Sequence, residues 1–331
     1  MTRSLLGVEF GDATLEASVR AGLTEIEDQL RLAVTSDDEF VGGAASYLVN
    51  AGGKRFRPLV SVLAAHFGDA SRPEIVPAAV VVELTHLATL YHDDVMDEAD
   101  VRRGAVSANT RWGNTVAILT GDFLFSRASN LLADLGPYAV RLQATTFERL
   151  VIGQIRETVG PRGGADPIEH YLAVLADKTG SLIATAAEFG AHYAGADPAV
   201  TDALRRFGEQ IGVAFQISDD ILDIAAESAQ SGKTPGTDLR EGVATLPVLY
   251  ALRSPAPAGS RLRELVSRPL VDDADHAEAL ALLRGSSAID DARATLQSYA
   301  DTARDMLADL PDVPARDAFI TLTEMVIART G

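Results

Sequence analysis

Helical patterns recur along almost the whole sequence, and no stretch alternates apolar and polar residues over the length of a β-strand. Ser36 and Glu39 have the spacing of a capping box, and the paired glycines Gly52 and Gly53 would end the helix that begins there. Asp197, which precedes a proline, marks another clear helix start. The sequence therefore predicts an all-α chain.

The expected helices are long, and short segments rich in glycine and proline separate them. After the helix that begins at Ser36, we expect helices over about 58–68, 73–98, 114–135, 138–159, 168–194, 198–228 and 238–253. Shorter helices would follow to the C-terminus. The segment DVRRGA at 100–105 is expected to be a loop.

The best candidate for a domain boundary is RSPAPAGSR at 253–261, which is too short to be a linker. A length of 331 residues is compatible with one or two domains. We expect a single domain over 1–331, a helical bundle too large for four helices. Its motif-bearing core would cover about 36–253, and residues 254–331 would add outer helices.

Composition excludes several kinds of protein. The chain has no cysteine, which excludes a disulfide scaffold, a thiol nucleophile, a cysteine-liganded zinc site and an iron–sulfur cluster. A net charge of −18, from 29 Lys and Arg against 47 Asp and Glu, argues against nucleic acid as a partner. The N-terminus lacks the pattern of a secretory signal, and no run of about 18 uncharged apolar residues is present. We expect a soluble, cytoplasmic protein.

Two aspartate clusters of the form DDxxD lie far apart in the sequence, each inside a helical pattern: Asp93, Asp94 and Asp97, and Asp219, Asp220 and Asp223. A helix places the first and third carboxylates of each cluster on one face. Three close carboxylates repel one another unless a cation neutralises them, and hard oxygen ligands suit Mg²⁺. One such cluster could equally be a solvated acidic helix face. Two clusters, both flanked by large apolar residues, favour paired metal sites.

Basic residues gather beside glycines, close in sequence to the aspartate clusters. They occur in GGKRFRP at 52–58, RRG at 102–104, KTG at 178–180 and GKT at 232–234. Arginine binds phosphate oxygens through two parallel hydrogen bonds, and lysine acts as a mobile charge. Each group alone could be a capped helix end, a surface loop or a helix break. Together they favour a site where cations and Mg²⁺ hold a polyphosphate substrate in a negatively charged protein.

Six motifs in order make the chain similar to the trans-isoprenyl diphosphate synthases, the polyprenyl synthetase family. They run from about Gly52 to Pro247 as GGKRFRP, HLATLYHDDVMD, RRG, KTG, FQISDDILD and GKTPGTDLREGVATLP. The resemblance implies an all-α isoprenoid synthase fold around a deep central cavity, and usually a homodimer. It also implies that the two aspartate clusters face each other across the cavity mouth.

The resemblance assigns roles to particular residues of this chain. The metal ligands, for three Mg²⁺ per active site, would be Asp93, Asp94, Asp97, Asp219, Asp220 and Asp223. Contacts to the allylic diphosphate would come from Arg102, Lys178, Thr179, Gln216 and Lys233. The site for isopentenyl diphosphate would comprise Gly53, Lys54, Arg57, His86, Arg103 and Phe215. The catalytic set would be Asp93, Asp94, Asp97, Lys178, Asp219 and Lys233.

The last motif departs from the family pattern. Many relatives carry lysine where this chain has Thr237 and Val243. We therefore assign neither position to diphosphate binding, and this edge of the site is expected to be weaker or differently built.

The resemblance also places the growing product beside the helix that carries the first cluster. Short-chain relatives have bulky aromatics four and five residues before the first aspartate, where this chain has Thr89 and Ala88, and Thr85 lies one turn further back. A helical turn rises about 5.4 Å, on the order of one isoprene unit. We therefore expect a long-chain product of six or more units, of the kind used for a menaquinone side chain. The alternative is that another helix blocks the tunnel through Phe147, Leu150 or Ile152.

The implied activity is that of a prenyltransferase. Neutralising the diphosphate lets the allylic C–O bond ionise, and the double bond of isopentenyl diphosphate attacks the resulting cation. The departing diphosphate can accept the proton, and an apolar pocket keeps water from quenching the cation. The alternatives are a farnesyl or geranylgeranyl diphosphate synthase, and less favoured ones are a class I terpene cyclase and a non-catalytic subunit of a heteromeric synthase. The allylic primer, and any peripheral membrane contact for product release, stay open.

Overall fold

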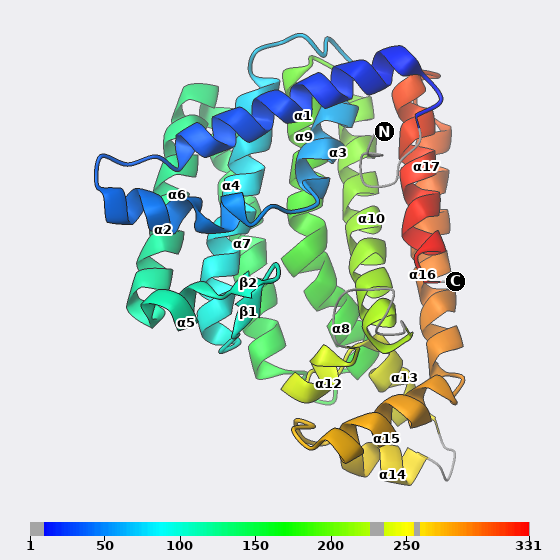
Figure 1. Cartoon of the computed structure of the whole chain (residues 1–331). Coiled ribbons are helices and arrows are strands. Elements are labelled where there is room, and N and C mark those ends of the chain that lie inside the picture. Colours follow the sequence, from blue (N-terminus) through cyan, green and yellow to red (C-terminus); the bar gives the residue numbers. More distant parts are fainter. Residues whose placement is uncertain (1–9, 226–234, 255–258, 331) are drawn as a thin grey trace. The chain divides into compact units, whose positions relative to one another are not determined.

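The structure is a computed structural model that describes residues 10–225, 235–254 and 259–330 (Figure 1). These residues form helices almost throughout, with one short hairpin of two strands. The helices are α1 Ala13–Ala33, α2 Glu39–Asn50, α3 Phe56–Ala65, α4 Ile75–Met96, α5 Ala108–Trp112, α6 Asn114–Leu135, α7 Pro137–Val159, α8 Pro167–Leu175, the π-helical turn η1 Ala176–Gly180, α9 Ser181–Tyr193, α10 Pro198–Ala225, α12 Thr237–Glu241, α13 Leu246–Arg253, α14 Gly259–Leu265, α15 Asp273–Arg284, α16 Ala288–Ala308 and α17 Pro314–Ala328. The strands are β1 Val101–Arg102 and β2 Ala105–Val106. The predicted all-α class is confirmed.

Several local predictions need correction. Helix α2 is capped by Asp38, whose side chain accepts hydrogen bonds from the backbone N–H groups of Phe40 and Val41, and not by Ser36. The segment expected to be a loop at 100–105 contains β1 and most of the hairpin. The helix expected over 168–194 is divided by η1, and the one expected over 238–253 is broken at Gly242, where φ is 79°. Helix α1 was not predicted.

The chain divides into two compact units, each built from several segments. Unit 1 takes its described residues from Met1–Glu148, Leu182–Gly208 and Asp309–Phe319. Unit 2 takes its described residues from Arg149–Ser181, Glu209–Ala308 and Ile320–Gly331. The boundary considered at 253–261 lies inside unit 2, so it does not separate them. A single functional domain around a central cavity stays a prediction.

Helix α4 forms the centre of unit 1. It packs against α1, α3 and α6 (Figure 1). Apolar side chains occur around its whole circumference, with Glu83 as a buried charged exception, and Val80, Val82, Leu84 and Leu87 are fully buried. A helix that is apolar all round is stable only when it is covered on all sides. Each such side chain contributes about 1.5–3 kcal/mol to the stability of the fold when it is removed from water. This burial fixes the position of α4, and with it the position of the aspartates at its C-terminal end.

Helix α4 is also long and apolar enough to cross a membrane by length and composition, and it is the only described helix that meets that test. However, 67% of its most apolar window is buried within the protein. The core helix of a soluble protein has the same properties.

In unit 2, the second half of α10 supplies the core with an apolar stripe. Ile217, Ile221 and Ile224 are fully buried. Between them, the hydroxyl of Ser218 donates to the carbonyl of Val326 on α17 at 2.9 Å. The apolar stripe therefore fixes the rotation of α10, and the aspartates between its members take defined directions.

Candidate active site

The first aspartate cluster lies at the C-terminal end of α4, where its three carboxylates have unequal surroundings. Asp94 is fully buried, and its two oxygens accept from the Arg102 Nε at 2.6 Å and from the Ala108 N–H at 3.1 Å. Asp93 is half-buried. Asp97, the C-cap residue that follows α4, is exposed. Asp93 and Asp97 are four residues apart and so share a face. The structure thus buries one carboxylate of the cluster and leaves the other two on the accessible side.

The β1–β2 hairpin brings Arg102 back to the end of α4. Its two residue pairs are Val101 with Val106 and Arg102 with Ala105. The Arg102 Nη2 lies 3.6 Å from the Asp97 Oδ2, in addition to the bond with Asp94. The predicted neighbourhood of Arg102 and the first cluster is therefore present in unit 1.

The adjacent arginine, Arg103, faces the glycine turn after α2. It has a left-handed backbone conformation, with φ of 53°, and its Nη1 donates to the carbonyl of Leu48 at 3.0 Å and to that of Gly52. Gly53 has φ of 153°, and a Cβ built there would lie 3.0 Å from the Arg103 Cζ. A side chain at Gly53 would therefore displace Arg103.

A buried glutamate, Glu83, holds the basic residues of this region together. Its Oε1 lies 3.1 Å from the Arg55 Nη1 and 3.9 Å from the Arg103 Nη2, and only 2% of its side chain is exposed. Glu27 on α1 binds the Arg55 Nε at 2.8 Å. Arg55 is thus engaged by two carboxylates, and its role is to fix the turn that carries Lys54 and Arg57.

Arg57 and His86 carry the signs of a binding site for an anion. The Nε of Arg57 is buried and has no hydrogen-bond partner among the described residues. Burial lowers the pKa of Arg57 to about 10. Burial, followed by the charge of Arg57 and Arg103, holds the pKa of His86 well below 6.5, so its imidazole is neutral near pH 7. A half-buried guanidinium whose buried Nε is an unused donor fits a phosphate oxygen.

The second aspartate cluster lies on α10 in unit 2. Asp220, its middle residue, is buried and accepts hydrogen bonds from the Tyr171 hydroxyl and from the Gln216 Nε2, the latter at 2.9 Å. Burial raises the pKa of Asp220 to about 7, and the charges of Asp219 and Asp223 add to this effect. The middle aspartates of both clusters are therefore held by protein groups.

The flanking aspartates of the second cluster contact other parts of unit 2. Asp219 forms an ion pair with Arg329, whose guanidinium lies 5.0 Å above the ring of Phe215. Asp223 accepts from the backbone N–H groups of Thr237 and Asp238, each at 3.2 Å. Asp223 thus caps the start of α12. Thr237 and the exposed Val243, the two departures from the family pattern, flank that short helix.

The KTG motif forms the π-helical turn η1, which a network of ion pairs fixes. Asp177 receives the Arg149 Nε at 3.0 Å and the Arg156 Nη1 at 2.7 Å. The Lys178 Nζ lies 2.6 Å from the Glu157 Oε2, and the side chain of Thr179 is buried. A π-helical turn within a helix commonly marks a functional position, which agrees with the prediction that this motif is more than a helix break.

The three residues predicted to control product length differ in their surroundings. Ala88 and Thr85 are fully buried, and Thr89 is half-buried with its hydroxyl donating to the carbonyl of His86 at 2.8 Å. Thr85 lines a pocket between α4, α6 and α7 that Phe147 also lines. Leu150 and Ile152 belong to unit 2, so the alternative that they block the tunnel stays a prediction.

The donor set fits divalent metals bound together with a phosphate substrate. Aspartate oxygens are hard ligands of the kind that Mg²⁺ takes, and Mg²⁺ usually keeps places for substrate phosphates. Within 10–225, 235–254 and 259–330, no three acidic or histidine side chains are close enough to hold a cation by themselves. Lys233, predicted to contact the allylic diphosphate, lies outside the described residues.

Sequence reasoning missed several residues that shape these surroundings: Glu83, Glu27, Tyr171, Arg329 and Gln143. Glu83 had a signal, because it is the one acidic residue in the apolar run from Val76 to Leu84. The others had none, since their partners lie far away in the sequence.

The comparisons with known proteins agree in naming one family. The sequence model described as polyprenyl synthetase matches residues 38–283. A nonaprenyl diphosphate synthase of Mycobacterium tuberculosis is 52% identical over 98% of this chain and 97% of its own length. A dimethylallyltranstransferase of the same organism is 44% identical over 97% of this chain and 98% of its own length.

Solved structures give the same result. A geranylgeranyl pyrophosphate synthase from Corynebacterium glutamicum, complexed with calcium and isoprenyl diphosphate, has a TM-score of 0.88 and 48% identity, covering 98% of this chain and 100% of that one. A decaprenyl diphosphate synthase from Rhodobacter capsulatus has a TM-score of 0.87 and 32% identity, covering 96% and 99%. The named products of these similar proteins thus range from short to long.

Proposed function

This chain belongs to the polyprenyl synthetase family and is a prenyltransferase, and from that premise we propose that it elongates an allylic diphosphate with isopentenyl diphosphate to a long-chain all-trans product. The observation that supports the chemistry best is Arg57, which is half-buried and whose buried Nε lacks a partner among the described residues beside a neutral His86. A diphosphate supplies the missing acceptor.

The basic residues of unit 1 would bind isopentenyl diphosphate. Arg103 lies against the glycine turn at Gly53, Lys54 and Arg57 follow that turn in the sequence, and Glu83 pairs with Arg55 and Arg103. His86 stays neutral near pH 7 and can donate to the diphosphate without adding charge. In unit 2, Phe215 would complete this site.

The aspartates of each cluster would have different roles, some binding metal and others supporting the site through protein contacts. We assign Asp93 and Asp97 to the metals and Asp94 to Arg102, because both oxygens of Asp94 already have protein donors. In the second cluster both oxygens of Asp223 also have donors, the backbone N–H groups of Thr237 and Asp238, so its assignment to the metals, together with that of Asp219, rests on the family pattern. Asp220 would support them through Tyr171 and Gln216. This proposal differs from the expectation that all six aspartates ligate Mg²⁺ because it gives Asp94 and Asp220 supporting roles.

Bound Mg²⁺, for which we keep the expected three per site, would neutralise the charge that develops on the leaving diphosphate. Arg102, Lys178, Thr179, Gln216 and Lys233 would hold the allylic diphosphate. The apolar residues of α4 and α10 that flank the aspartates would exclude water while the allylic cation exists. The released diphosphate would take the proton from the condensed intermediate, so no side-chain base is required.

The activity has a direct test. Purified protein with isopentenyl diphosphate and each of several allylic primers should release diphosphate and form a lipid when Mg²⁺ is present. Excess chelator should lower the rate by at least about 10³-fold, since metal stabilisation of the leaving group is then lost. Consumption of an allylic diphosphate alone would instead indicate a terpene cyclase, and no reaction with any primer would contradict the proposal.

We also propose a product of six or more isoprene units, as for a menaquinone side chain. Small side chains at Thr89, Ala88 and Thr85 support this length, as do the long-chain names of several similar proteins. Thr89→Phe should shorten the product by two or more units while the rate of the first condensation stays within about threefold. Sizing the lipid by reversed-phase chromatography measures this, and an unchanged length would place the floor of the tunnel elsewhere.

The protein is further proposed to act as a homodimer through α6 and the first half of α7. In unit 1 these helices expose Ile118, Leu119, Val140 and Phe147. Exposed apolar residues grouped on neighbouring helices are typical of an association surface. Light scattering of the purified protein tests this assignment.

A further inference from the structure

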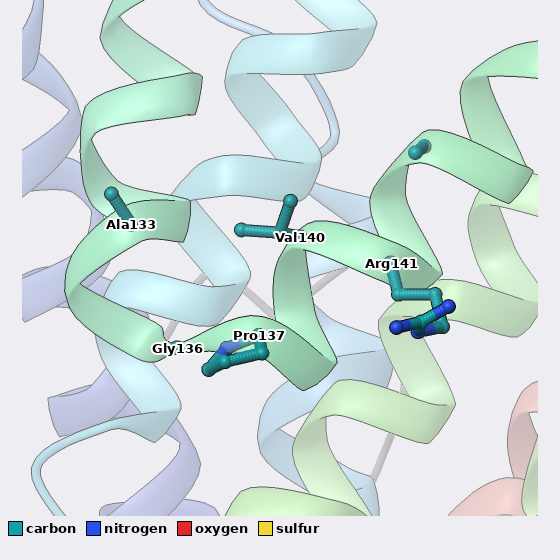
Figure 2. Close-up of a pocket in the computed structure, with 6 residues that line it drawn as sticks. Ala133, Gly136, Pro137, Val140 and Arg141 are labelled. Atoms are coloured by element: carbon teal, nitrogen blue, oxygen red, sulfur yellow. The ribbon is translucent and has the colours of Figure 1, made fainter.

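Two pockets lie in a row along α6 and α7 in unit 1. The first, of about 410 Å³, is lined from Thr85 and His92 on α4 to Val140 and Ala144 on α7. The second, of about 430 Å³, lies at the turn between α6 and α7 and is lined by Ala133, Gly136, Pro137, Val140, Arg141 and Ala144. Val140 and Ala144 therefore belong to both pockets. Figure 2 shows the side chain of Val140 directed toward the neighbouring helix, which carries Ala133.

One end of the first pocket lies at the same level along α4 as the first aspartate cluster, because His92 lines it. His92 is adjacent to Asp93 in the sequence, and its Nε2 lies 3.4 Å from the Asp122 Oδ1 at the same end of the pocket. The pocket continues to Thr85, which is about two helical turns, or roughly 10 Å, further down α4. Thr85 is one of the residues that the proposed product tail would pass.

The inner wall of the first pocket is fixed by a buried hydrogen bond. The Gln143 Nε2 donates to the Thr85 Oγ1 at 2.8 Å, and the same Thr85 hydroxyl donates to the Val81 carbonyl at 2.9 Å. Gln143 therefore cannot swing into the pocket without leaving Thr85. The way past it is on the outer side, where Ala144 has only a methyl group.

We propose that the growing prenyl tail leaves the first pocket over Ala144 and enters the second, so that Ala144 sets how long the product becomes. The inference rests on the proposed prenyltransferase function and names the specificity-determining residue for its product. Ala144 and Val140 are exposed in the single chain. The pairing proposed for the dimer would cover their outer side and give the tail an apolar wall.

The test compares three phenylalanine variants of the full-length protein. Ala144→Phe blocks the junction of the pockets and should shorten the product by at least two isoprene units. Ala133→Phe lies in the second pocket alone and should give a product of intermediate length, because the turn lies about 10 Å beyond Ala144 along α7. Thr145→Phe is the matched control, since Thr145 is exposed on α7 and lines neither pocket.

The readouts separate the possible causes of failure. All variants should release diphosphate in the first condensation at rates within about threefold of the parent protein, because the pockets lie beyond the reacting atoms. The order Ala144→Phe, Ala133→Phe, parent in increasing product length supports the proposal. A product of unchanged length from Ala144→Phe overturns the proposal. If Ala144→Phe also dissociates the dimer while the product length stays the same, the pockets bind the partner subunit and not the prenyl tail. If the parent protein itself forms no lipid, the proposed function has failed rather than this inference.

Discussion

Replacing Asp93 with asparagine should lower the rate of condensation by at least about 10³-fold, with little effect on the stability of the fold. Asp93 is half-buried at the end of α4 and is assigned to a metal, so losing its charge weakens the stabilisation of the leaving diphosphate. Rate is measured as diphosphate release at saturating Mg²⁺, and stability is measured by urea unfolding.

The neighbouring variant Asp94→Asn provides the comparison. Asp94 binds Arg102 and the Ala108 N–H inside the protein, so its loss leaves a guanidinium without its counter-charge. This variant should lose activity and also about 3 kcal/mol of stability. If both variants kept their stability, or if Asp93→Asn retained the higher activity, the division of roles between these aspartates would be wrong.

Replacing Glu83 with glutamine should produce the largest loss of stability of any single substitution discussed so far, about 3–5 kcal/mol. Its carboxylate is buried between Arg55 and Arg103, and breaking a buried ion pair leaves an uncompensated charge. The free energy of unfolding follows from urea titration at constant ionic strength. We also expect KM for isopentenyl diphosphate to rise, because Arg103 is no longer held against the glycine turn.

Glu27→Gln is the matched control for Glu83. Glu27 also binds Arg55, but 25% of its side chain is exposed, so solvent compensates for part of the loss. Its substitution should cost only about 1 kcal/mol. Equal losses from the two variants would mean that the ion pairs of Arg55 govern the stability of this region. The contact of Glu83 with more than one arginine would then add nothing.

The long helices could be predicted almost to the residue because their periodic patterns are sustained over many turns. The expected 114–135 coincides with α6, and 138–159 differs from α7 by one residue. Boundaries set by competing caps were harder, because Ser36 and Asp38 are both good N-caps and differ little in energy. Only the folded chain shows that Asp38 takes the role.

The residue types of the candidate site could be predicted from the sequence, but the different surroundings of the aspartates within each cluster could not. The aspartates of one cluster are the same residue type at neighbouring positions, so the sequence treats them alike. Asp94 differs from Asp93 because a hairpin and the start of α5 return to it. Arg329 reaches Asp219 across 110 positions of sequence, a contact for which no local pattern exists.

The short β1–β2 hairpin limits which insertions and deletions related proteins can accept. Loops on protein surfaces usually tolerate insertions and deletions between related proteins. Here consecutive arginines bind different parts of unit 1, Arg102 the carboxylate of Asp94 and Arg103 the carbonyls of Leu48 and Gly52. A gain or loss of one residue would turn each guanidinium to the wrong side. We therefore expect related proteins to keep the length of this hairpin unchanged.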